Sequence, residues 1–261
     1  MGRDPDGVKD PDGYWYGDYY GVLAFETNTA VVPNPPKDWS DLLKPEYKGQ
    51  VALSGDPNVS AQAIQTVLAS SLANGSSLDD ATAGLDFWKQ AVQAGNFVPV
   101  IATNGTIDHG DTPITIRWNY NSLANRDQAE EESGLVIDVA ILASGLRRRL
   151  HPGHQRVRAP SQRRPAVGGV PVPDEGQNAW LTGYCYPARF DAMKAAGTLD
   201  ADALAKLPDA TGAVFATIDQ QKLPPRRSSP TRSRAGTRSS ARLRPGERRP
   251  LTLVAHAGPV P

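Results

Sequence analysis

The stretch Gly13–Asn28, GYWYGDYYGVLAFETN, places five aromatic residues within positions 14–20 and follows them with the apolar run Val22–Phe25. Thr27 and Asn28 close this run. Aromatic and β-branched residues favour extended backbone, and a polar pair after them is typical of a turn. We therefore predict a strand that enters a turn. The plain alternative is a core strand that is merely rich in tyrosine.

Charge is distributed very unevenly along the 261 residues, although the formal net charge is zero. Sixteen of the 28 basic residues are arginines in two tracts, 147–164 and 226–249, which together hold only one acid. The rest of the chain is acidic, as suits a soluble globular protein of one large or two smaller domains. Cys185 is the only cysteine, so a disulfide within the chain is excluded.

No apolar run approaches the length that spans a membrane, and residues 1–13 lack the apolar centre of a signal peptide. As written, the chain is therefore expected to remain in the cytoplasm. No catalytic triad, metal cluster or paired carboxylates stand at useful spacing, so we expect no enzyme activity, no metal and no cofactor. His109 lies in a Gly/Asp-rich turn, where a solvated histidine is the simpler reading than a metal ligand.

Short apolar runs alternate with segments of helical spacing between residues 38 and 141. This alternation predicts an α/β fold with helices on both faces of a sheet. In the helix over 77–94, Leu85, Trp88 and Val92 share one face, and a turn is expected at Asn104–Gly105. The predicted helices cover 38–43, 61–73, 77–94 and 120–132, and the predicted strands cover 50–54, 96–101, 112–118 and 134–141.

The chain divides into five parts by texture. Residues 1–13 form an N-terminal extension and 14–141 the main α/β lobe. The arginine-rich segment 142–173 and the tail 223–261 show no period of 2 or 3.6, so both are expected to be irregular. Between them, 174–222 is expected to form a helical segment in which two short helices meet near Tyr186–Pro187.

Ligand-binding chemistry is suggested where predicted strands end. A strand followed by Gly55-Asp56-Pro57-Asn58-Val59-Ser60 and a helix directs backbone N–H groups and a hydroxyl at one point, which suits an anionic group. Ordinary N-capping by Ser60 is the alternative, and it needs no ligand. The stretch Arg117-Trp118-Asn119-Tyr120 stands where another predicted strand ends and a helix begins, and ligands gather at the carboxyl ends of strands in open α/β sheets.

Several segments, in this order and spacing, resemble the extracellular solute-binding proteins of bacterial ABC importers, in the branch that binds iron(III), thiamine and polyamines. The resemblance covers roughly 9–141 and 174–222. The segments are DPDGYWYGDYYGVLAFETN (10–28), DWSDLLKPEYKGQVALSGDPNVSAQAIQ (38–65), TPITIRWNYNSLA (112–124), PDEGQNAWLTGYCYPARF (173–190) and KLPDATGAVFATIDQQ (206–221).

This resemblance implies a type II periplasmic-binding-protein fold, in which two lobes close over a solute and the closed form docks on a membrane permease. Tyr14–Asn28 then resembles the first crossing between lobes, so most of lobe two is present and lobe one is incomplete, as if the chain were truncated at its N-terminus. The family is periplasmic or extracellular, and we expect a monomer that binds a small solute. The expected ligand-binding residues are Trp15, Tyr16, Asp56, Ser60, Trp118 and Tyr120.

The solute itself stays open. The iron-binding branch uses an adjacent tyrosine pair, but Tyr19 and Tyr20 lie within a predicted strand, where neighbouring side chains point to opposite faces. Polyamine binders often place an aspartate where this chain has Asn119. The first feature argues against iron(III) as the solute, and the second argues against a polyamine.

The arginine tracts admit two interpretations. Basic, flexible segments can bind nucleic acid, but neither tract holds the aromatic residues that stack on bases, so no nucleic-acid partner is expected. The simpler hypothesis is that both tracts are read out of frame, because shifting the frame by one base permits helix-like sequences resembling the family. Resequencing the gene tests this hypothesis, and a continuous frame through both tracts contradicts it. An enzyme on the same bilobal fold is a further alternative.

The frame-shift hypothesis has a physical consequence for the 174–222 segment. Its helices would lose their partners in lobe one, so their apolar faces are expected to stay exposed. An exposed apolar surface binds hydrophobic dyes and promotes aggregation.

Overall fold

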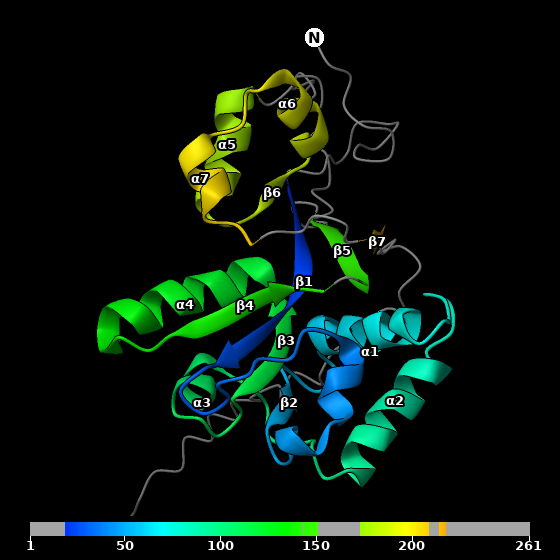
Figure 1. Ribbon diagram of the computed structural model, residues 1–261. Coiled ribbons are helices and arrows are strands. Elements are labelled where there is room, and N and C mark those ends of the chain that lie inside the picture. Colours follow the sequence, from blue (N-terminus) through cyan, green and yellow to red (C-terminus); the bar gives the residue numbers. More distant parts are fainter. Residues whose placement is uncertain (1–18, 143, 151–172, 209–213, 218–261) are drawn as a thin grey trace, which may run out of the picture. The chain divides into compact units, whose positions relative to one another are not determined.

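The computed structural model describes residues 19–142, 144–150, 173–208 and 214–217, all within one compact unit, Met1–Pro225 (Figure 1). The helices are η1 (Trp39–Leu43), η2 (Pro45–Tyr47), α1 (Ala61–Ala73), α2 (Thr82–Gln93), α3 (Asn104–Asp108), α4 (Asn119–Ser133), α5 (Asp174–Thr182), α6 (Phe190–Ala196) and α7 (Ala201–Ala205). The strands are β1 (Tyr19–Asn28), β2 (Val51–Leu53), β3 (Ile114–Trp118), β4 (Ile137–Ile141), β5 (Ser144–Leu150), β6 (Tyr186–Pro187) and β7 (Val214–Thr217).

Strand β1 is shared by two ladders of a mixed sheet. Its second half, Leu23–Asn28, pairs with β3 on one side and β4 on the other, both antiparallel. Its first half, Tyr19–Val22, pairs with β5 and β6, again antiparallel (Figure 1). Parallel pairs complete the sheet, β2 with β3 and β5 with β7. Because every residue of β1 after Tyr19 is buried, its near-continuous apolar sequence is that of a central strand.

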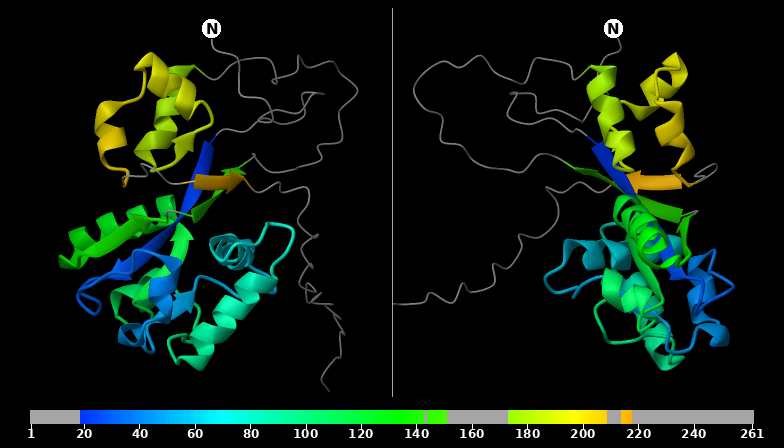
Figure 2. Two further views of the ribbon diagram at one scale, coloured as in Figure 1. Left: turned by 45° about the vertical axis from the view of Figure 1, so that its right-hand side comes forward. Right: turned by 90° about the vertical axis from the view of Figure 1, so that its left-hand side faces the viewer.

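Helices cover both faces of the β2-β3-β1-β4 ladder. Leu23 and Phe25 belong to the larger core cluster, which also contains residues of η1, α1 and α2. The opposite face is covered by α3 and α4, and α4 lies along β4 (Figure 2). The predicted α/β class and the helices on both faces are thereby confirmed. The smaller cluster on this second face consists of Ala52, Ala102, Ile107, Ala129 and Ile137.

Local signals placed most element ends correctly. Asp38 caps η1 with a capping box that Asp41 completes, and Ser60 caps α1. Gly134, predicted as the first residue of a strand, instead ends α4 at φ +69°, in the left-handed region that favours glycine, and β4 begins at Ile137.

Helices α1 and α2 pack closely at Gly84, which lies in the first turn of α2. A Cβ atom placed on Gly84 would lie 2.2 Å from the Val67 carbonyl oxygen and 2.7 Å from Ser71 Oγ. The Gly84 N–H donates to that same Ser71 Oγ at 2.7 Å. Only glycine therefore permits this approach of the two helices.

We expect Gly84→Ala to lower the free energy of unfolding by about 1–3 kcal/mol, because the added methyl group forces α1 and α2 apart. Urea denaturation measures the loss. Gly105→Ala is the matched control, since a Cβ at Gly105 meets nothing within 4 Å. Equal stabilities of the two variants would contradict the close packing.

Three local predictions were wrong. Helix α2 begins at Thr82 rather than at 77, and its buried residues include Phe87 and Trp88, whereas Leu85 and Val92 are exposed. The predicted strand over 96–101 is reduced to one bridge between Val51 and Phe97. The predicted turn at Asn104–Gly105 is the start of α3, which Thr103 caps. At α3, capping by Thr103 outweighed the Asn-Gly turn signal.

The structure changes part of the predicted division of the chain after residue 141. Ser144–Leu150 is not irregular but forms strand β5, because ladder hydrogen bonds to β1 and β7 involve only the backbone. The two short helices that meet at Tyr186–Pro187 are confirmed as α5 and α6, although the segment also contributes strand β7. Residues 1–18, 143, 151–172, 209–213 and 218–261 lie outside the described residues, and with them the predicted extension and tail.

The apolar faces of α5 and α6 are enclosed, contrary to expectation. Leu181 and Met193 are buried, and Tyr186 forms a third cluster with Tyr20 and Val22 of β1. Among the described residues, no large apolar side chain of 173–208 is exposed. Contacts with β1 therefore give these helices an apolar partner.

Candidate functional site

The carboxyl ends of β2 and β3 meet at one edge of the sheet, because the two strands are parallel. Ser54 and Gly55 follow β2, while Asn119 and Tyr120 follow β3 directly and open α4. In open α/β sheets this is the edge at which ligands bind. The first half of β1 reaches the same edge, since β1 is antiparallel to β3.

The Gly55–Ser60 loop is tightly folded. Gly55 has a φ of +133°, and a Cβ there would lie 2.4 Å from Ser60 Oγ. Ser60 Oγ accepts from the Ala63 N–H at 3.4 Å, so Ser60 acts as the N-cap. Asp56 Oδ1 accepts from the backbone N–H and from Nδ2 of Asn58, both at 2.8 Å. Both candidate side chains thus shape the loop at the site edge.

The predicted aromatic walls have different positions. Trp118 is only 2% exposed and lies within the larger core cluster, so its prediction as a solute-contacting wall was wrong. Its position as the last residue of β3 turns the indole into the interior. Tyr120 is partly buried and forms an edge-to-face contact with Tyr19, with ring centroids 6.4 Å apart. Trp15 and Tyr16 lie outside the described residues.

Asn119 joins three segments at the point where the two ladders of β1 meet. Its Oδ1 accepts from the Val22 N–H at 2.9 Å, and its Nδ2 donates to the Tyr184 carbonyl oxygen at 2.7 Å. Asn119 is fully buried. Asn119, where polyamine binders often have an aspartate, therefore links β1, α4 and the α5–β6 turn.

Tyr184 fastens this turn to α4 a second time. Its hydroxyl donates to the Asp127 carboxylate, and its φ of +63° is the only positive value among the described residues other than glycine. Burial and the Asp127 charge raise the pKa of Tyr184. Burial acts to raise the pKa of Asp127, but hydrogen bonds from Tyr184 and Arg126 outweigh it and hold that pKa below its usual range. The bond therefore persists across the neutral pH range.

Aromatic contacts add a third link between the same segments. Tyr19 of β1 stacks on Trp180 of α5 with ring centroids 4.2 Å apart. Gly21, two residues along β1, accommodates the Tyr120 ring, since a Cβ on Gly21 would lie 2.5 Å from that ring. The glycine in an aromatic strand was a usable signal of this close approach.

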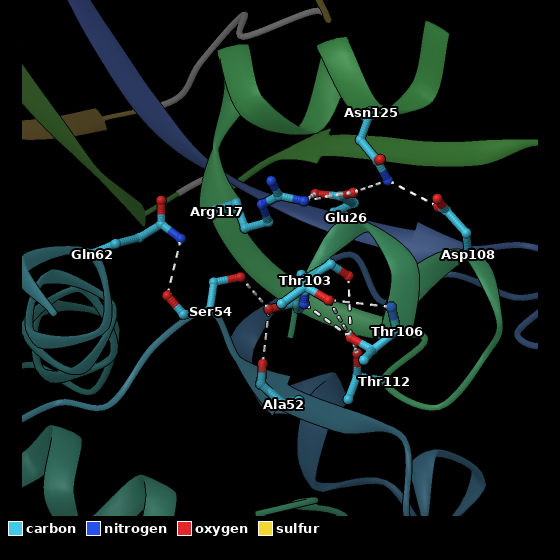
Figure 3. A network of polar contacts seen from close by, with 11 residues as sticks. Glu26, Ala52, Ser54, Gln62, Thr103, Thr106, Asp108, Thr112, Arg117 and Asn125 are labelled. Carbon is cyan, nitrogen blue, oxygen red and sulfur yellow. Dashed lines mark hydrogen bonds and ion pairs between the residues drawn. The ribbon is translucent and has the colours of Figure 1, made fainter. Parts of the chain in front are cut away.

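A buried polar network lies beneath the edge, on the face that α3 and α4 cover (Figure 3). Arg117 Nη1 donates to both carboxylate oxygens of Glu26, at 3.2 and 3.1 Å. Asn125 Nδ2 donates to Glu26 at 2.9 Å and to Asp108 at 3.1 Å. Burial raises the pKa of the fully enclosed Glu26, while the Arg117 charge opposes that rise.

Sequence reasoning did not single out Glu26 or Arg117 as site residues. The available signal was an acid within an apolar strand, because a buried carboxylate requires a partner. Nothing local identified Arg117 as that partner, since 91 residues separate the two.

The described residues offer few reactive groups. Burial raises the pKa of the Cys185 thiol to about 12, so this thiol is protonated at neutral pH. No group of three or more His, Cys, Asp or Glu residues that could hold a metal ion occurs in the described part of the chain. No described helix is both long and apolar enough to cross a membrane.

Comparisons with known proteins agree with this architecture. The model of the family described as "Bacterial extracellular solute-binding protein" matches residues 1–141. No curated protein matches the chain. The Atu4243-GABA receptor is 15% identical with a TM-score of 0.55, over 82% of this chain and 66% of that one.

Two further solved structures show the range of the matches. An ABC transporter from Clostridium perfringens ATCC 13124 is 12% identical with a TM-score of 0.54, over 81% of this chain and 67% of that one. The substrate-binding protein PotD of the spermidine/putrescine ABC transporter of Streptococcus pneumoniae is 16% identical with a TM-score of 0.39, over 51% and 40%. The chain thus spans between about two fifths and two thirds of the length of these proteins. At these identities the two higher scores show the fold alone.

Proposed function

The chain belongs to the bacterial extracellular solute-binding proteins and has their mixed α/β fold, and from this premise we propose that it is the solute-capturing component of an ABC importer. It binds a small solute at the edge formed by the carboxyl ends of β2 and β3 and delivers it to a membrane permease. It acts in the periplasm or outside the cell, as a monomer and without a catalytic step. Nothing in the described residues favours nucleic-acid binding or an enzyme reaction.

The observation that carries this proposal is the division of β1 between two ladders. A strand that pairs with β3 and β4 in one half and with β5 and β6 in the other connects two groups of elements through continuous backbone. Bending within such a strand changes the relation between the two groups without breaking either ladder. This is the requirement of a hinge that closes over a ligand.

Solute contacts are proposed for residues at this edge. Ser60 and the start of α1 offer a hydroxyl and backbone N–H groups, and Tyr120 offers part of an aromatic face. Asp56 lies in the connecting loop, where its carboxylate already orders the turn. Trp15 and Tyr16 remain sequence predictions for the same role.

A solute screen tests the proposal. The full chain is heated with a library of amino acids, organic acids, phosphate esters, sugars and polyamines, and each hit is titrated by calorimetry. We expect at least one solute to raise Tm and to bind in a 1:1 ratio, because a ligand that binds only the folded state stabilises it. A screen without any saturable 1:1 ligand would overturn the proposal.

A further inference from the structure

Arg117 lies near the edge where the carboxyl ends of β2 and β3 meet, although it was not among the predicted site residues. It is the penultimate residue of β3, and Leu53 pairs with Ile116 in the parallel ladder. Ser54 and Arg117 are therefore neighbours on one face of the sheet, because side chains alternate along each strand. The close view shows the Arg117 side chain between Glu26 and Ser54 (Figure 3).

The guanidinium uses only one of its three nitrogens within the described protein. Nη1 donates to Glu26, whereas Nε and Nη2 form no hydrogen bond with any described residue. The N–H groups of Nε and Nη2 include two that point in parallel along one edge of the guanidinium plane. This edge matches the two oxygens of a carboxylate.

Glu26 and its partners hold the guanidinium in place. Glu26 is fully buried, and the Arg117 side chain is 12% exposed. Asn125 ties Glu26 to Asp108 on α3, so the carboxylate that orients Arg117 is itself fixed from two helices. A binding group supported in this way keeps its orientation before the ligand arrives.

The neighbouring Ser54 hydroxyl is not available as a hydrogen-bond donor to a ligand. Thr115 Oγ1 donates to the Ala52 carbonyl oxygen at 2.9 Å, so the 3.1 Å contact between Ser54 Oγ and Thr115 Oγ1 uses the Ser54 proton. Ser54 therefore offers only acceptor lone pairs to a ligand. The charged donor at this edge is Arg117.

We propose that Arg117 is a solute-binding residue that Glu26 orients, and that it selects solutes carrying a carboxylate. The inference rests on the proposed function and specifies its substrate class. Because Glu26 offsets the positive charge of Arg117, a singly charged, planar carboxylate suits the site better than a doubly charged phosphate.

Calorimetry on the full chain tests the inference. The probes are succinate, glutarate, glutamate and 4-aminobutyrate as carboxylates, with inorganic phosphate, putrescine and glucose as the other classes. We expect binding among the carboxylates, and a decrease in affinity of about tenfold to a hundredfold in Arg117→Lys, which keeps the charge but loses the planar fork. Arg126→Lys on α4, which exchanges another guanidinium, serves as the matched control and leaves the affinity unchanged.

A second variant keeps the test decisive if Arg117→Lys does not fold. Glu26→Gln retains an acceptor for Nη1 and removes the negative charge behind the guanidinium. It is expected to tighten carboxylate binding by about threefold or more, an effect that a purely structural role would not produce. Binding of only phosphate, putrescine or glucose, or unchanged affinity in both variants, overturns the inference but leaves the proposed function standing. A chain that binds no solute in either screen overturns both.

Discussion

Arg117→Met is expected to lower the free energy of unfolding by about 3–5 kcal/mol at neutral pH, because it leaves the Glu26 carboxylate enclosed without its cationic partner. Glu26 is fully buried and bound through two contacts to Arg117 Nη1. Asn125 still donates a hydrogen bond to Glu26 at 2.9 Å, but a neutral donor of this kind does not offset the desolvation of a charge. Urea denaturation followed by tryptophan fluorescence measures the loss.

The loss is expected to depend on pH in a defined direction. Burial raises the pKa of Glu26 in the folded chain, so between its ordinary value of 4.5 and that higher value the folded state holds more protons than the unfolded one. The contribution of Glu26 to stability therefore falls as pH rises through this window. Removing the Arg117 charge raises the pKa of Glu26 further, so the variant loses less stability near pH 5 than near pH 8.

Two comparisons separate this charge effect from lost packing. The double variant Glu26→Gln with Arg117→Met is expected to recover most of the loss, since no buried charge remains. Arg126→Met removes a guanidinium whose ion pair with Asp127 is more exposed, and it is expected to cost about 0–1 kcal/mol. If the single and double variants are equally unstable at both pH values, the ion pair does not stabilise the fold.

Asn119→Ala is expected to lower the free energy of unfolding by about 2–4 kcal/mol, because it leaves two backbone groups without their hydrogen-bond partner. The Val22 N–H loses an acceptor at 2.9 Å, and the Tyr184 carbonyl loses a donor at 2.7 Å. Val22 is 1% exposed, so water cannot readily replace the lost bond. Urea denaturation measures the loss in the free energy of unfolding. Faster hydrogen exchange of the Val22 amide shows that the lost bond is at this position.

Asn58→Ala provides the matched control for this substitution. Asn58 is exposed, and among the described residues its side-chain amide bonds only to Asp56 in the same turn, so its loss is expected to change stability by about 0.5 kcal/mol or less. A Val22 amide that exchanges equally slowly in wild type and Asn119→Ala would show that Asn119 does not hold the two ladders together.

Some residues of the candidate site could be predicted from the sequence and others could not, for a physical reason. Ser60 was identified because capping depends on residues within one turn, and the short loop after β2 contains Gly55, Pro57 and Ser60 within six residues. Trp118 was misplaced because the direction of the last side chain of a strand depends on what packs against it. Arg117 and Asn119 act through partners 91 and 97 residues away, and no local pattern specifies such pairs.

Sequence alone determined the α/β class, strand β1 and the N-caps Asp38 and Ser60. These features follow from periodicity and from backbone groups that are satisfied nearby. Tertiary structure alone decided that β1 serves two ladders and that an arginine-rich segment supplies strand β5. It also decided that Arg117 pairs with Glu26 and that Asn119 bonds to Val22 and Tyr184. The reason is that burial and strand pairing depend on which distant segments come together, and a local sequence pattern does not specify these long-range contacts.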